Sequence, residues 1–131
     1  MKTSLRLLAL ATLALLVSIE GAAAGSLSGT WSGSGTAVPN DGAKEKVSCR
    51  MTYSPQGGKL VGVNVKCTST SAKQIRQAGQ LRQIGANTYV GQFASAKHAV
   101  SGRMTVTVRG SVQTVSFKSN KGNASVTLKK R

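Results

Sequence analysis

Few side chains of this chain could carry acid–base, nucleophilic or metal chemistry. Its 131 residues hold 3 acidic side chains and 1 histidine against 18 lysines and arginines, for a formal net charge of +15. Asp41 and Glu45 lie near a Pro-Asn-Asp-Gly turn among lysines, and no acidic residue is placed to orient His98. Acid–base and triad catalysis need two or three such groups in contact, and metal sites need clusters of them. We therefore expect no catalytic residue, no metal site and no cofactor.

The two cysteines predict a disulfide. Cys49 and Cys67 fall on the apolar positions of two alternating segments, on either side of a Pro-Gln-Gly-Gly-Lys turn. Period-two alternation around such a turn is typical of a β-hairpin. A turn centred on Gly58 places Cys49 opposite Cys67 and Tyr53 opposite Val63, close enough for a cross-strand bond. The chain has no Cys-x-x-Cys spacing, which argues against a thiol-exchange enzyme.

Basic residues are predicted to face one another on the outer side of two hairpins. The same register places Arg50 opposite Lys66, and a turn at Gly110-Ser111 places Arg103 opposite Lys118. Like charges directly opposite each other destabilise a sheet, and an anion would relieve each pair. Outward positions also carry lysines simply for solubility. The predicted anion-binding residues, with the basic C-terminal tail, are Arg50, Lys66, Arg103, Lys118, Lys129, Lys130 and Arg131.

The N-terminal segment has the pattern of a secretory signal peptide over residues 1–24. A basic start precedes an apolar run over 7–17, and Ala22-Ala23-Ala24 offers a cleavage site. The alternative is an uncleaved membrane anchor, for which the run is short. We expect an exported protein, periplasmic or secreted, with one domain over 25–131. An even cysteine count fits such a compartment.

The expected partners follow from charge and compartment. An exported basic protein meets lipopolysaccharide, anionic lipid head groups and glycans, and we expect its basic outer face to bind such polymers or surfaces. We expect no nucleic-acid partner, because the few aromatic residues share the inward parity and offer no stacking platform.

The rest of the pattern predicts an all-β fold. The segments 103–109, 112–118 and 124–129 alternate cleanly, and a register in which residue numbers sum to 243 places Phe117 opposite Val126. Residues 73–84 match neither period well, and a strand is favoured over a short helix. About eight strands in an up-and-down meander predict a small closed barrel, with a two-sheet sandwich as the alternative. The predicted inward residues are Trp31, Val47, Cys49, Met51, Tyr53, Val61, Val63, Val65, Cys67, Ile75, Leu81, Tyr89, Phe93, Met104, Val106, Val108, Val115, Phe117, Val126 and Leu128.

Two resemblances accompany these residues. Gly29-Thr30-Trp31 on a first strand resembles the calycin barrels: lipocalins, avidins and small metalloproteinase inhibitors. That likeness implies an arginine from a late strand, Arg109 or Arg131, packed over the tryptophan. It also implies an alternative function, either a small-ligand binder or an inhibitor of a secreted hydrolase. The single tryptophan departs from avidin-type sites, and the few residues before Gly29 are short for an inhibitory segment.

The segments 31–35, 45–53 and 113–117 resemble small exported all-β proteins of Gram-negative bacteria that have no assigned function. This second resemblance supports export and the all-β fold and adds no activity.

Overall fold

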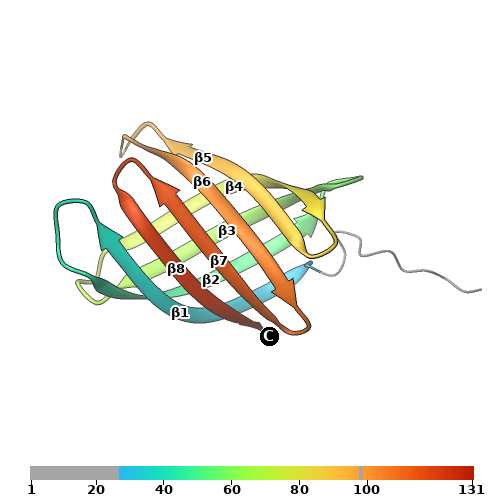
Figure 1. The fold of residues 1–131 in the computed structure, drawn as a ribbon, viewed down its shortest axis with the longest axis horizontal. Helices are drawn as coiled ribbons and strands as arrows, with labels where there is room; N and C mark the ends of the chain where they lie inside the picture. The colour runs from blue at the N-terminus through green and yellow to red at the C-terminus, as the bar shows by residue number, and fades with distance from the viewer. Residues whose placement is uncertain (1–26, 98) are drawn as a thin grey trace, which may run out of the picture.

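The computed structural model describes residues 27–97 and 99–131, which form eight antiparallel strands in chain order (Figure 1). Each strand is hydrogen-bonded to the next, and β8 pairs with β1, so the sheet closes into a barrel. The predicted meander is confirmed, and the fold is a barrel rather than a sandwich. The predicted signal peptide and His98 lie outside the described residues. The strands are β1 (Gly29–Pro39), β2 (Glu45–Pro55), β3 (Leu60–Ser69), β4 (Gln74–Gly85), β5 (Thr88–Ser95), β6 (Val100–Arg109), β7 (Val112–Ser119) and β8 (Gly122–Lys130).

The inward residues of the strands fill the barrel. Most of the predicted inward set is buried. Phe93 and Phe117 are partly buried, and their rings meet edge to face with centroids 6.1 Å apart. Leu27 and Gln113 are also buried, and neither was predicted from the alternation. No helix in the described part of the chain is long and apolar enough to span a membrane.

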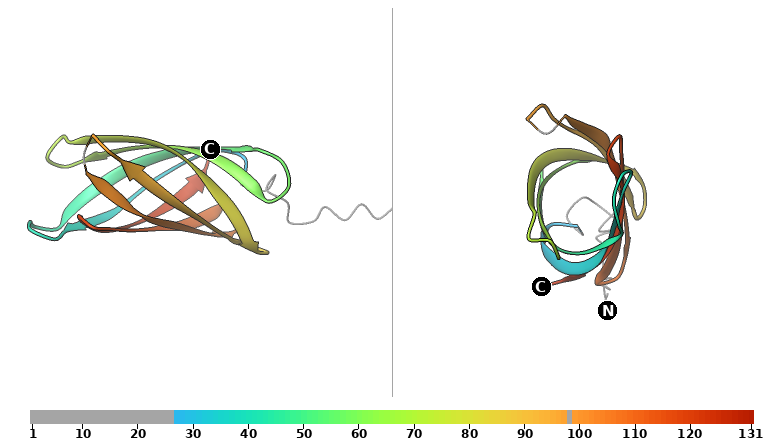
Figure 2. Two further views of the ribbon diagram at one scale, coloured as in Figure 1. Left: turned by 90° about the horizontal axis from the view of Figure 1, so that it is seen from above. Right: turned by 90° about the vertical axis from the view of Figure 1, so that its left-hand side faces the viewer.

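Ile75 has the inward parity but is 57% exposed, so its predicted place in the core is wrong. Hydrogen-bonded pairing between β4 and β5 stops at Gln80 and Gln92. Beyond that point the β5–β6 hairpin leaves the barrel wall (Figure 2), and the Gln77 side-chain amide donates to the Ala94 carbonyl at 3.2 Å. Ile75 therefore lies beside a gap in the backbone pairing, with no registered β5 residue opposite it.

The register of the last hairpin differs from its prediction by two residues. Phe117 lies opposite Ala124, not Val126, because the turn is tight: Ser119 pairs with Gly122, which has a φ of 143°. Few residues other than glycine adopt that backbone conformation. A shift of two residues leaves each side chain on its own face, so Val126 is still buried.

Two glycines allow β1 to pair with both of its neighbours. A Cβ atom on Gly33 would overlap the Thr127 carbonyl oxygen, and one on Gly35 would overlap that of Ser125. These carbonyls belong to β8, so side chains at Gly33 and Gly35 would prevent the close approach of β1 and β8.

Trp31 closes one end of the barrel. Its indole Nε1 donates to the Leu27 carbonyl at 2.9 Å, and both residues are fully buried. The Lys130 ammonium lies 5.6 Å from the centroid of the tryptophan ring, within cation–π range. A basic residue of the last strand thus covers the tryptophan, but it is Lys130 rather than Arg109 or Arg131.

Candidate anion-binding surface

The disulfide between Cys49 and Cys67 is present as predicted, with a Cα–Cα distance of 4.1 Å. It joins β2 to β3 on the inner side of the barrel wall, where both residues are buried. Arg50 and Lys66 are the next residues toward the middle of each strand, and they point outward. The covalent link therefore fixes the register of the two strands that carry the first basic pair.

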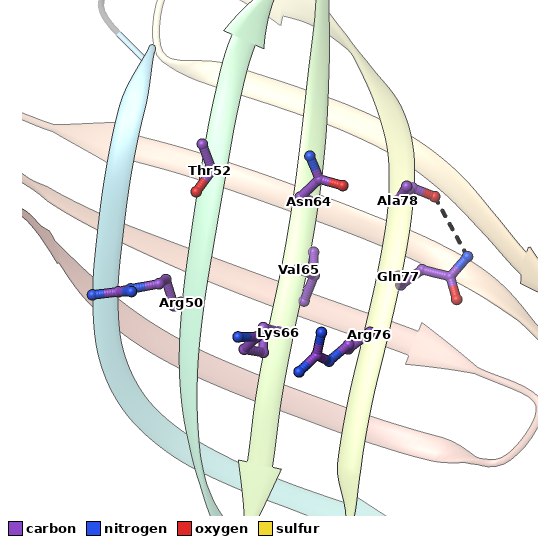
Figure 3. A pocket seen from close by; sticks show the side chains of 8 residues that line it. All are labelled: Arg50, Thr52, Asn64, Val65, Lys66, Arg76, Gln77 and Ala78. Atoms are coloured by element: carbon purple, nitrogen blue, oxygen red, sulfur yellow. Dashed lines mark hydrogen bonds between the residues drawn. The ribbon is translucent and has the colours of Figure 1, made fainter.

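A third cation extends this pair across β4. Arg50 lies opposite Lys66, and Lys66 lies opposite Arg76, so three exposed cations occupy neighbouring strands (Figure 3). They line a shallow hollow of about 400 Å³ on the outer wall, together with Thr52 and Asn64. The sequence did not predict this position for Arg76, because apolar and polar residues alternate poorly over residues 73–84. A register in which residue numbers sum to 142 would have placed it.

The row of cations continues in the other direction through β1. Arg50 lies opposite Ser32, which lies opposite Lys129 on β8. The Arg131 guanidinium donates to the Ser32 hydroxyl at 2.9 Å, so a cation also covers this position.

Beyond Lys129 the register passes through Val112 on β7 to Arg109 on β6. We call this continuous set of outward residues the basic belt; its members are Arg109, Lys129, Arg131, Arg50, Lys66 and Arg76.

Among the described residues, no acidic side chain pairs with the three cations on β2 to β4. None of Arg50, Lys66 and Arg76 makes an ion pair within residues 27–97 and 99–131. Glu45 is five residues from Arg50 along β2, about 17 Å at 3.4 Å per residue. That distance exceeds the Debye length of about 8 Å at physiological ionic strength. Glu45 therefore contributes little to the electrostatic balance of Arg50, Lys66 and Arg76.

Uncharged polar residues flank the belt over β1 to β4. On one side, successive register partners are Ser34, Ser48, Thr68 and Gln74. On the other side they are Thr30, Thr52 and Asn64, and the row ends at the small apolar residue Ala78. Short hydroxyl and amide groups can donate hydrogen bonds to sulfate, phosphate or sugar oxygens, and they leave the cations accessible.

The second predicted pair lies on a different wall. Arg103 faces Lys118 as predicted, but β6 and β7 are four strands away from β2 and β3, halfway around the barrel. Its outer neighbours are Gln92 and Asn123, both uncharged.

Lys130 has the inward parity and covers Trp31, so it does not belong to the outer wall. The structure thus groups four of the predicted residues, Arg50, Lys66, Lys129 and Arg131, and separates the other three from them.

The interior holds a small polar cluster. The Tyr53 hydroxyl donates to Gln113 Oε1 at 2.5 Å and lies 3.3 Å from Met51 Sδ, and burial raises the pKa of Tyr53 well above its usual value of 10.0. The Tyr89 hydroxyl and Gln113 Nε2 are buried without a hydrogen-bond partner among the described residues. Gln113 shares its parity with Val115, and this could have marked it as inward.

The side chains first considered for acid–base chemistry are not assembled. Asp41 lies in the β1–β2 connection and Glu45 begins β2. Across the described ranges, no three His, Cys, Asp or Glu side chains lie close enough together to hold a metal ion.

Comparison with known proteins gives the fold and no family. No protein-family model matches the chain, and no curated protein matches it. Among solved structures, a redesigned β-barrel, mFAP1, bound to DFHBI is similar with a TM-score of 0.66 at 16% identity, over 83% of this chain and 98% of that one. The structure of EF1p2_mFAP2b bound to DFHBI gives a TM-score of 0.68 at 15% identity, over 85% of this chain and 98% of that one. A de novo designed fluorescence-activating barrel gives 0.63 at 18% identity, over 82% and 96%. At these identities the likeness extends to the eight-stranded barrel alone.

Proposed function

We propose that this protein is a non-enzymatic binder of anionic polymers or surfaces and that it binds them through its basic outer wall. The observation that carries the proposal is the uninterrupted row Arg50–Lys66–Arg76, which has no acidic register partner in the described strands. The disulfide also supports the expectation of an exported protein, because such bonds persist in oxidising compartments. Lipopolysaccharide, anionic lipid and acidic glycans are partners available there.

The electrostatics of the row favour an anion. Exposed like charges opposite each other on neighbouring strands repel by about 0.5 kcal/mol, and Lys66 has such a neighbour on each side. A sulfate or phosphate group near Lys66 replaces these repulsions with attractions and can accept hydrogen bonds from both guanidinium groups. Because the three side chains are exposed, salt should weaken this binding strongly.

Fluorescence anisotropy with a labelled polyanion such as polyphosphate tests the proposal. The triple variant Arg50→Gln, Lys66→Gln, Arg76→Gln should bind about 10- to 100-fold more weakly at low salt, since each contact contributes roughly 0.5–1 kcal/mol. The matched control Lys46→Gln, Arg82→Gln, Arg103→Gln removes the same charge from elsewhere and should lose much less. Equal losses in the two triples would show that only total charge matters. Binding that resists high salt would contradict the electrostatic account.

A second candidate function is the binding of a small ligand inside the barrel. The observation that favours it is the pair of buried polar atoms, Tyr89 Oη and Gln113 Nε2, that lack described partners. Buried polar groups are normally hydrogen-bonded, and an internal ligand or an ordered water would satisfy them. Two of the solved structures named above are bound to DFHBI. A thermal-shift screen of small aromatic and polar compounds tests this candidate, and Gln113→Leu should abolish any shift that arises there.

A further inference from the structure

We infer that the basic belt selects a flexible, linear polyanion that winds around the barrel across the strands, rather than a flat anionic surface. This inference rests on the proposed function and adds the shape of the ligand. It is carried by the continuity of the belt. Strand pairing and the Arg131–Ser32 hydrogen bond link its members from β6 through β8 and β1 to β4.

Curvature argues against a flat ligand. In a closed barrel of eight strands, the outward direction turns by about 45° from one strand to the next. Lys129 and Arg50 are two strands apart and so point about 90° apart, while Lys129 and Arg76 point to opposite sides of the molecule. A bilayer could contact only the cations of two or three adjacent strands at once. A chain that bends can contact the whole belt.

The path and length of the belt set the size of the ligand. Six strand-to-strand steps of about 4.8 Å give roughly 29 Å from Arg109 to Arg76. Arg109 ends β6 and Arg76 lies near the start of β4, so the path runs obliquely from one mouth of the barrel toward the other. Only a chain longer than about 29 Å can contact both ends.

The surroundings of the belt indicate the chemistry of that chain. Hydroxyl and amide side chains flank the cations, which suits sulfate or phosphate groups on a polar backbone. Trp31, Tyr53 and Tyr89 are buried, and no aromatic side chain belongs to the belt or its flanking rows. Bases of a single-stranded nucleic acid would find no ring on which to stack. The ligand class is therefore a linear sulfated or phosphorylated polymer.

A chain-length series with the whole protein tests the inference. Inorganic polyphosphate of about 10 Å contour length covers only the β2–β4 cations, whereas chains above about 29 Å reach the whole belt. The double variant Arg109→Gln, Lys129→Gln should weaken binding of the long chain about tenfold and change binding of the short chain less than twofold. The matched control Arg103→Gln, Lys118→Gln lies about 20 Å from Arg109 along β6 and should leave both affinities within twofold.

Three other outcomes have distinct meanings. If the Arg109/Lys129 variant weakens short and long chains equally, or affects neither, the belt does not act as one site and the inference is overturned. It is also overturned if vesicles of phosphatidylglycerol and phosphatidylcholine in equal parts bind more tightly than the long chain at equal anionic charge. If no polyanion of any length binds at low salt, the proposed function itself fails.

Discussion

Lys66 occupies the centre of three aligned cations, so replacing it should stabilise the folded protein while weakening its binding. Lys66→Gln removes the repulsion from both Arg50 and Arg76. At low ionic strength each repulsion costs about 0.5 kcal/mol, so the free energy of unfolding should rise by about 1 kcal/mol. For a domain of this size, that corresponds to an increase in Tm of roughly 5 °C.

Two further variants grade the effect. Lys118 has one basic neighbour, Arg103, and an uncharged one, Asn123, so Lys118→Gln should stabilise by about 0.5 kcal/mol. Lys46 lies opposite the uncharged Thr36 on β1, so Lys46→Gln should leave stability nearly unchanged. Urea unfolding of the three variants at 10 mM and at 1 M NaCl provides the comparison. At 1 M the Debye length is about 3 Å, and the differences should nearly disappear.

The reasoning is refuted if Lys66→Gln destabilises the protein, or if the three variants shift stability equally at low salt. The same holds if the gain at Lys66 persists unchanged in 1 M NaCl, because a packing or propensity effect would not be screened. An increase in stability together with weaker polyanion binding is the expected signature of a binding surface.

Four other outcomes follow from the structure. Replacing both Cys49 and Cys67 by alanine should lower the free energy of unfolding by about 3 kcal/mol, because the bond closes a loop with a sequence separation of 18; an unchanged urea midpoint would contradict this. Gly35→Ala should lower the free energy of unfolding by more than about 2 kcal/mol or prevent folding, because its Cβ would overlap the Ser125 carbonyl oxygen. At Gly79 the nearest atom to an added Cβ is 3.9 Å away, so Gly79→Ala should change stability by no more than about 0.5 kcal/mol in the same assay. Burial raises the pKa of Tyr53 above 10.0, so above pH 10 the unfolded chain loses this proton first and stability should fall with pH. Tyr53→Phe should reduce the slope of unfolding free energy against pH by up to about 1.4 kcal/mol per pH unit. An identical slope in the variant would contradict the assignment. Tyr53→Phe should also lower stability by about 1–2 kcal/mol at pH 7, since Gln113 Oε1 loses its buried donor, and a neutral effect on thermal unfolding would show that water replaces it.

The sequence predicted those features that depend on one turn and its two strands. The glycine-rich turn near Gly58 and the clean alternation around it determined the β2–β3 register, and with it the disulfide and the Arg50–Lys66 pair. Parity alone could not determine the β7–β8 register, because a two-residue and a four-residue turn leave Val126 on the same face.

Other features depend on contacts between distant parts of the chain. Strand β4 pairs with β5 along only part of its length, so the start of β4 does not need apolar residues at its inward positions. Gln77 and the exposed Ile75 occupy two of these positions, and the alternation of apolar and polar residues in β4 is therefore weak. For this reason Arg76 could not be placed from sequence. The belt also needs β1 to pair with both β2 and β8, which joins Arg50 to Lys129 through Ser32. That closure is a property of the whole barrel and is not contained in any single hairpin.

Mapping of backbone amide chemical shifts during titration with long-chain polyphosphate tests the central claim most directly. The account predicts that the largest shift changes follow the belt, at Ser32, Arg50, Lys66, Arg76 and Lys129, and that they disappear at high salt. Residues around Arg103 and Lys118 should change little. Changes centred on Arg103 and Lys118, or on interior residues such as Tyr89 and Gln113, would contradict a binding site along the basic belt.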